Sequence, residues 1–205
     1  MRRRTLLLAA PAGLLAECVS LFPKAPPVQL YRFGGGLKSA QQSPAGPNTT
    51  FAVAALPITF TDAAAGDQIL TTTGDEAAYI KGQRWVTSAS SLFEQALVNA
   101  FSANPGPARL LSSGEPVPPD FYLKLDVRSF EARYLQGQGA APTIEVTVNA
   151  ALSVPAGNAV SAVKLFSASI PADANRGSRI AAAFDQAVTQ VLQALVNWVD
   201  TKGNG

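Results

Sequence analysis

Every second side chain between residues 144 and 154 is apolar. The apolar set is Ile144, Val146, Val148, Ala150, Leu152 and Val154. Successive side chains of a strand point to opposite faces, so this period of two predicts a strand with one face buried against a core. No other part of the sequence constrains the fold as strongly as this pattern.

The segments on either side of this strand extend it into a sheet. Residues 121–127 show the same alternation, and the apolar phase then shifts over residues 130–134, which predicts a bulge near Ser129. Turn residues at 155–158 lead into a third apolar run over residues 160–170. We therefore expect an antiparallel meander of three strands.

Two segments have the periodicity of a helix. Apolar residues recur at helical spacing over residues 92–101, and the N-cap is either Ser91 or, one turn earlier, Thr87 or Ser88. A longer apolar stripe predicts a last helix from about Ser178 to Lys202. Both helices need a sheet or another helix to cover their apolar stripes.

Shorter strands are expected in the first third of the chain. They are Val28 to Phe33, Phe51 to Ala55, and a hairpin of residues 68–73 and 77–81, with a polar loop over residues 34–49. The fold class predicted from all these segments is α+β. It consists of an antiparallel or mixed sheet, built around the meander, with two helices packed against it in a single domain.

The first residues have the layout of a bacterial export signal, with three arginines followed by an apolar stretch. We predict a signal peptide over residues 1–17 and acylation of Cys18, because the residues before it resemble a lipobox. Residues 18–27 would then be a lipidated, proline-rich tether, and residues 28–202 the domain. Glu17 departs from the lipobox pattern, and the alternative is a secreted protein with one unpaired cysteine.

Composition excludes several classes of function. Histidine is absent and Cys18 is the only cysteine in the 205 residues. Ser-His-Asp and Cys-His catalytic systems, a zinc site of the usual Cys/His kind and an internal disulfide are therefore excluded. We expect a protein that is not an enzyme, with no catalytic residues, no metal site and no cofactor.

Charge points away from nucleic acid as a partner. Without residues 1–17 the chain has equal numbers of basic and acidic residues, whereas phosphate neutralisation needs a surplus of basic ones. Charged residues make up only 15% of the sequence. This low charge leads to the hypothesis that the domain forms a homo-oligomer through a mainly apolar face.

Trp85 follows the expected hairpin and precedes the first expected helix. Its size and position favour a core wedge between sheet and helix. The alternative is a ring exposed on a surface that binds a partner or lipid. The sequence alone leaves both interpretations open.

The order of several weak motifs resembles the ABC-type transport auxiliary lipoprotein family, the PqiC-like group. The matching features are Cys18 with the start that follows it, Gly66 to Leu70, Tyr79-Ile80 before Arg84-Trp85, the helix from Leu92, the strand from Leu123 to Glu131, and the last helix ending near Trp198. The resemblance covers nearly all of the expected domain.

The resemblance implies a role as well as a fold. It implies a non-enzymatic periplasmic lipoprotein that works with an ABC transporter and a mammalian-cell-entry (MCE) domain protein to move phospholipids or other hydrophobic molecules between the two membranes. With no aspartate directly after Cys18, the periplasmic face of the outer membrane is the expected location. Partner binding is placed at Tyr79, Arg84 and Trp85, with residues 34–49 and 105–119 as further candidate surfaces.

Two functions from other classes stay open at this point. One is a free-standing periplasmic carrier that holds a lipid or another ligand in a pocket between helices and sheet. The other is a structural lipoprotein of the cell envelope with no transport role. A copurifying protein partner, a stoichiometric lipid, or neither would distinguish the three.

Overall fold

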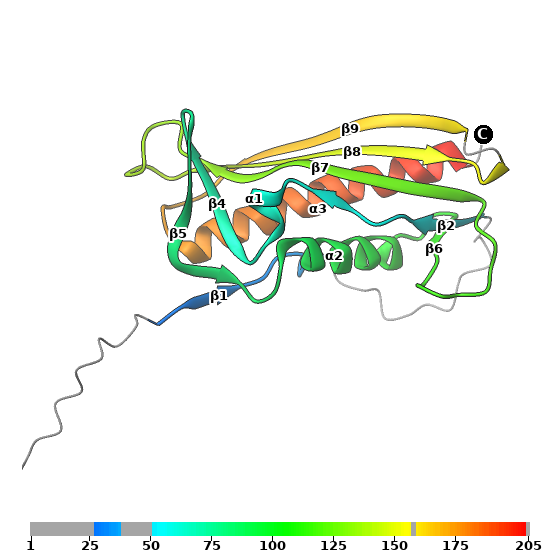
Figure 1. Ribbon diagram of the computed structural model, residues 1–205, viewed down its shortest axis with the longest axis horizontal. Helices are drawn as coiled ribbons and strands as arrows, with labels where there is room; N and C mark the ends of the chain where they lie inside the picture. The colour runs from blue at the N-terminus through cyan, green and yellow to red at the C-terminus, as the bar shows by residue number, and fades with distance from the viewer. Residues whose placement is uncertain (1–26, 38–50, 157–158, 204–205) are drawn as a thin grey trace, which may run out of the picture.

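The computed structural model describes residues 27–37, 51–156 and 159–203. Within these ranges the chain forms one mixed sheet with helices packed against it (Figure 1). This confirms the α+β class expected from the sequence. Cys18, most of the loop expected at residues 34–49 and part of the turn at residues 155–158 lie outside the described residues.

The predicted meander is confirmed. Its strands are β7 (Phe121–Arg133), β8 (Thr143–Ser153) and β9 (Val160–Pro171), each antiparallel to the next. In β8, buried and partly exposed residues alternate along the whole strand. The register between β7 and β8 shifts between Val127 and Ser129, where the change of apolar phase predicted a bulge.

Shorter strands occupy the other side of β7. They are β1 (Gln29–Tyr31), β2 (Phe51–Ala55), β3 (Thr59–Phe60), β4 (Gln68–Thr73), β5 (Glu76–Trp85) and β6 (Ala108–Leu110). Along its length β7 pairs in parallel with β2, then β3, then β4. The predicted hairpin is β4 and β5, and β1 and β6 add parallel pairs at the outside.

Three helices lie among the described residues: α1 (Asp62–Ala65), α2 (Ala89–Ala103) and α3 (Gly177–Gly203). The N-cap of α2 is Ser88, whose Oγ accepts a hydrogen bond from the Ser91 backbone N–H at 3.2 Å. The single turn α1 was not predicted, because four residues carry no helical period. None of the helices in the described ranges has the length and apolarity needed to cross a membrane.

Helix α3 runs along the meander and fixes the two ends of the domain (Figure 1). Its start packs against β1 and β5, since a Cβ on Gly177 would collide with the side chains of Gln83 and Tyr31. Its end lies beside β2, where a Cβ on Gly203 would collide with the Phe51 ring. The strand that follows the expected tether therefore lies at the end of the molecule where α3 begins.

Candidate functional site

Trp85 lies in the core rather than on a surface. Only 2% of the residue is exposed, and its ring packs edge-on against Phe33 at 5.0 Å and Phe184 at 5.1 Å between centroids. Phe130 completes the cluster at 4.9 Å from Phe184. The structure therefore corrects the placement of Trp85 among partner-binding residues, because a ring enclosed by Phe33, Phe130 of β7 and Phe184 of α3 has no face left for a partner. The core-wedge alternative describes what is observed.

Arg84, the residue before Trp85, faces outward. Its Nη1 donates to both carboxylate oxygens of Asp67 at 2.9 Å, and the two side chains are 44% and 45% exposed. Arg84 lies beside Leu30 in the β1–β5 register, and Leu30 is 59% exposed. An exposed ion pair contributes little to stability, so it leaves Arg84 available for a partner.

Tyr79 contacts the same short segment as Arg84. Its hydroxyl donates to the backbone carbonyl of Ala63 at 3.1 Å, and the residue is 42% exposed. Ala63 belongs to α1, and Asp67 follows α1 directly. Tyr79 and Arg84 therefore both attach residues 62–67 to β5, and we call Ala63, Asp67, Tyr79 and Arg84 the α1 corner.

The segment at residues 105–119 is held by a local network. The Glu115 Oε1 accepts a hydrogen bond from Arg109 at 2.8 Å, and Oε2 accepts one from the Ser112 backbone N–H at 3.1 Å. The hydrogen bond from Arg109, with a smaller effect from Ser112, lowers the pKa of Glu115 below its ordinary value of 4.5. This carboxylate fixes a turn, which is a structural role.

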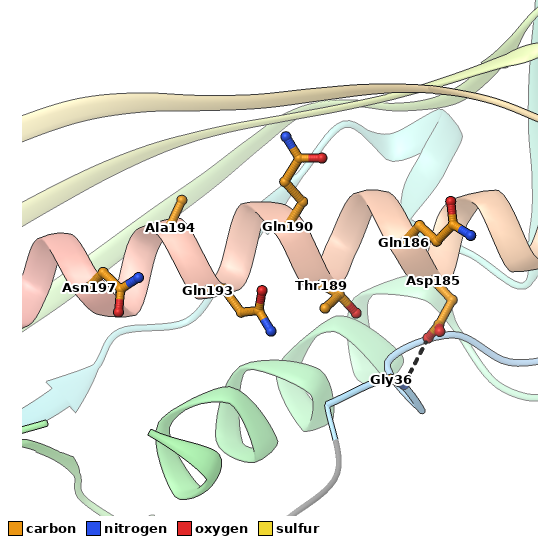
Figure 2. A pocket seen from close by; sticks show the side chains of 8 residues that line it. All are labelled: Gly36, Asp185, Gln186, Thr189, Gln190, Gln193, Ala194 and Asn197. Atoms are coloured by element: carbon orange, nitrogen blue, oxygen red, sulfur yellow. Dashed lines mark hydrogen bonds between the residues drawn. The ribbon is translucent and has the colours of Figure 1, made fainter. Parts of the chain in front are cut away.

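A shallow groove of about 480 Å³ runs along α3, which the sequence did not single out. Figure 2 shows its lining of mainly amide side chains, with Gln186, Gln190, Gln193 and Asn197 on α3 and Gly36 opposite. Asp185 crosses one end, where its Oδ1 accepts the backbone N–H groups of Gly35 at 2.9 Å and Gly36 at 3.3 Å. This groove is open to solvent along α3, whereas a carrier encloses most of its ligand, so the groove does not favour the carrier function.

Acidic side chains are dispersed over the part of the chain that the structure describes. No cluster of three or more Asp, Glu, His or Cys side chains occurs there that would hold an ion. Several acidic residues instead pair with arginines or accept backbone N–H groups.

Comparison with known families decides what kind of protein this is. Residues 36–196 match the model of the family described as ABC-type transport auxiliary lipoprotein component. The chain belongs to this family. The match begins just after β1 and ends within the last turns of α3, so it covers nearly all of the described domain.

Two solved structures show how widely this auxiliary-lipoprotein fold recurs. A Xanthomonas campestris protein of the DUF330 family is 26% identical, has a TM-score of 0.68, and is matched over 87% of this chain and 95% of its own. A hypothetical protein from Chlamydia trachomatis shares the fold at 11% identity, with a TM-score of 0.52 and coverage of 75% and 98%. None of the curated proteins compared with the chain matches it.

Membership of the auxiliary lipoprotein family supports the coarse form of the functional expectations. The family is one of lipoproteins that accompany ABC-type transport systems, which points to a lipid-anchored envelope protein without enzymatic activity.

Proposed function

We propose that this protein is the lipid-anchored accessory of an ABC transport system that contains an MCE-domain protein and moves phospholipids or other hydrophobic molecules between the inner and outer membranes. The observation that carries the proposal is the family match over residues 36–196. The protein acts by binding and positioning its partners, which requires a tether, a rigid domain and an exposed docking surface, and no cofactor.

The anchor in this proposal is Cys18. Export removes residues 1–17, and two acyl chains or one plus a further signal hold a protein stably at a bilayer. Val19 and Ser20 follow the cysteine, which favours the periplasmic face of the outer membrane over retention at the inner one. Residues 18–27, with three prolines, then place β1 and the start of α3 at the membrane-proximal end of the domain.

The docking surface in this proposal is the α1 corner. Arg84 and Tyr79 combine an exposed cation with an exposed aromatic ring, and these two residue types recur among the residues that dominate binding energy at interfaces. Leu30 adds exposed apolar area beside Arg84. An acidic partner surface would exchange the Asp67–Arg84 pair for its own contact with the guanidinium.

A pull-down of the tagged full-length protein from native membranes in mild detergent tests the proposal. We expect mass spectrometry to find an MCE-domain protein or its ABC ATPase in the eluate, together with an N-terminal peptide acylated on Cys18. The Cys18→Ser variant is expected to lose the acylated peptide and its membrane fraction. A stoichiometric lipid without protein partners would instead identify a carrier. An eluate with no lipid and no protein partner would identify a structural lipoprotein.

Substitution of Arg84 tests the docking surface separately. Arg84→Ala is expected to reduce partner recovery severalfold, while the matched Arg128→Ala is expected to leave it unchanged. Arg128 is a suitable control because it is also an exposed arginine in an ion pair, with Asp126 on β7. Equal recovery with both variants would exclude the α1 corner and leave the transport role to be judged by the first experiment.

A further inference from the structure

Strand β9 is an open edge of the sheet. It pairs with β8 in an unbroken register from Thr143↔Pro171 to Leu152↔Ala162, and among the described residues no other strand pairs with it. Edge strands present unpaired backbone groups that are able to join a further strand. In β9 these unpaired N–H and C=O groups lie on the side away from β8.

The hydrogen bonds between β8 and β9 determine which backbone groups of β9 face outward. The Ala172 backbone N–H donates to the Pro142 carbonyl at 2.9 Å, directly beyond the Thr143↔Pro171 pair. Bonded and non-bonded pairs alternate in an antiparallel ladder, so the even-numbered residues of β9 bond to β8. The outward-facing N–H and C=O groups consequently belong to the odd-numbered residues within the unbroken register, which are Val163, Leu165, Ser167 and Ser169.

None of these outward-facing residues is a proline or carries a charge. Val163 and Leu165 are 60% and 54% exposed, and Val160 at the start of the strand is 61% exposed. Proteins block edges with prolines, charges or bulges. Here the proline is the last residue, Pro171, the register shift lies at the start of the strand beside Ser161, and the one charged side chain, Lys164, has its ammonium 5.1 Å from the Phe166 ring.

The side of α3 that lies beneath this edge is uncharged as well. Trp198 packs against Phe166 of β9 at 5.7 Å between centroids, which places this side of the helix under the edge strand. Gln190 and Ala194 are exposed there and point toward the strands, whereas Thr189 and Gln193 point toward α2 (Figure 2). The acidic residue Asp185 is occupied on the opposite side by Gly35 and Gly36.

We propose that β9 pairs with β9 of a second copy of this chain, antiparallel, about a two-fold axis at Leu165. In this register Leu165 faces Leu165 of the second copy and Val163 faces Ser167. Lys164 then lies opposite Phe166, and its ammonium is already 5.1 Å from the Phe166 ring of its own chain. A register centred on Lys164 would oppose two ammonium groups, which is unfavourable.

A second copy fits this edge better than a strand from another protein. The two-fold axis lies perpendicular to the sheet, so both α3 helices fall on the same face of the continuous sheet. Helix α3 packs under both β8 and β9, so it lies close to the two-fold axis. The axes of the two α3 helices are then separated by roughly 8–10 Å, the usual distance between packed helices, and their uncharged sides face each other. A lone foreign strand would cover β9 and leave Gln190 and Ala194 exposed.

Disulfide trapping in the full-length protein in native membranes tests this arrangement. Leu165→Cys places two thiols across the axis, where the Cα separation of about 5.5 Å in a hydrogen-bonded pair suits a disulfide. We expect a band at twice the monomer mass under mild oxidation. Val117→Cys, at another exposed apolar position, is the matched control, and the wild type reports any bridge formed by Cys18.

We expect about tenfold more dimer from Leu165→Cys than from Val117→Cys, because a disulfide requires Cα atoms within roughly 7 Å. Val163→Cys combined with Ser167→Cys is expected to crosslink too, and adding Leu165→Pro to that pair is expected to reduce the crosslink severalfold. Leu165→Pro loses no hydrogen bond to β8, because the Leu165 N–H faces outward. Thermal melting checks that each variant is folded.

Three results would overturn the proposal. The first is a folded Leu165→Cys protein that stays monomeric under oxidation. The second is equal crosslinking at Val117→Cys, which would indicate random collision in the membrane. The third is a Leu165→Cys adduct whose mass spectrum contains a different polypeptide, which would identify β9 as a site for a foreign strand. The MCE and ABC partners of the proposed function take no part in this assay, so its result is independent of theirs.

Discussion

The two sides of β7 are built in different ways. On one side lie β8 and β9, which are long and follow β7 directly in the sequence. These strands pair through backbone hydrogen bonds along almost their full length. On the other side six strands, most of them short, pair mainly in parallel across long intervals of sequence. Short parallel strands leave more backbone N–H groups without a ladder partner, and buried groups of this kind need another acceptor.

Carboxylates accept backbone N–H groups within and beside the short strands. Asp120 accepts the Ala52 N–H at 2.7 Å, Asp200 accepts the Ala108 N–H at 3.0 Å, and Asp185 accepts the N–H groups of Gly35 and Gly36. Glu115 does the same for Ser112. The comparison shows that the meander depends on backbone pairing, whereas the other half depends on particular acidic side chains. Substitutions of these acidic side chains should therefore destabilise the short-strand half and leave the meander unchanged.

Trp85→Ala is expected to have the largest effect, because Trp85 connects the short-strand half to α3, which packs against the meander, through Phe33 and Phe184. Truncating a fully buried tryptophan costs about 3–5 kcal/mol of unfolding free energy. Urea denaturation followed by circular dichroism measures the loss. Trp85→Phe, which retains a ring, should lose much less. A loss below about 1 kcal/mol for Trp85→Ala would contradict the role of this residue as the junction.

Asp200→Ala is expected to have the next largest effect on stability. The Asp200 carboxylate is partly buried, and it accepts the Ala108 N–H and the Asn104 Nδ2 at 2.6 Å. Removing it leaves both donors unsatisfied, at a cost of about 1–3 kcal/mol. Hydrogen exchange should show faster exchange at Ala108 and its β6 neighbours, with β8 unchanged. Asp200→Asn keeps an acceptor oxygen, so its exchange rates should lie between those of the wild type and Asp200→Ala. Uniform acceleration across β6 and β8 would refute the separation of the halves.

The same division explains how much of the fold the sequence predicted. The alternation over residues 144–154 and the phase change near Ser129 describe contacts between neighbours in sequence, and both were confirmed. The parallel pairing of β2 with β7 was not predicted, because Val53 and Phe121 are paired by tertiary packing that leaves no local period. The short α1 was missed for a related reason, since Thr61 makes no side-chain cap there.

The candidate site was predicted less completely than the fold. Tyr79 and Arg84 were chosen from a resemblance, and their shared contact with residues 62–67 has no signature in the sequence. Trp85 was ambiguous because a large aromatic residue between two elements suits a core and an interface equally well. The resemblance named the family, which the match over residues 36–196 bears out. The acylation of Cys18 remains a prediction.

Asp185→Ala is expected to have a smaller effect than Asp200→Ala, because its hydrogen bonds to Gly35 and Gly36 are solvent-exposed. We expect a loss of about 0.5–1.5 kcal/mol, with faster hydrogen exchange at Gly35 and Gly36 only. Asp185→Asn should recover most of it. Gln186→Ala, the exposed neighbour on the same helix, is the control for changes in α3 itself. An effect on β9 exchange would show that this contact also supports the meander.

Glu115→Gln is expected to have the smallest effect and to depend on pH. The hydrogen bonds from Arg109 and Ser112 lower the pKa of the folded-state carboxyl below 4.5, so they favour the folded protein when the carboxyl is ionised. This stabilisation is present above pH 4.5 and is lost as the pH falls through the lowered pKa. Because the carboxylate is still in contact with solvent, the difference in Tm between wild type and Glu115→Gln should be small at neutral pH and vanish in acid. Glu94→Gln on the exposed side of α2 controls for the loss of a surface charge. If Glu115→Gln lowers Tm equally at both pH values, the turn at residues 112–115 does not depend on the ionised carboxylate.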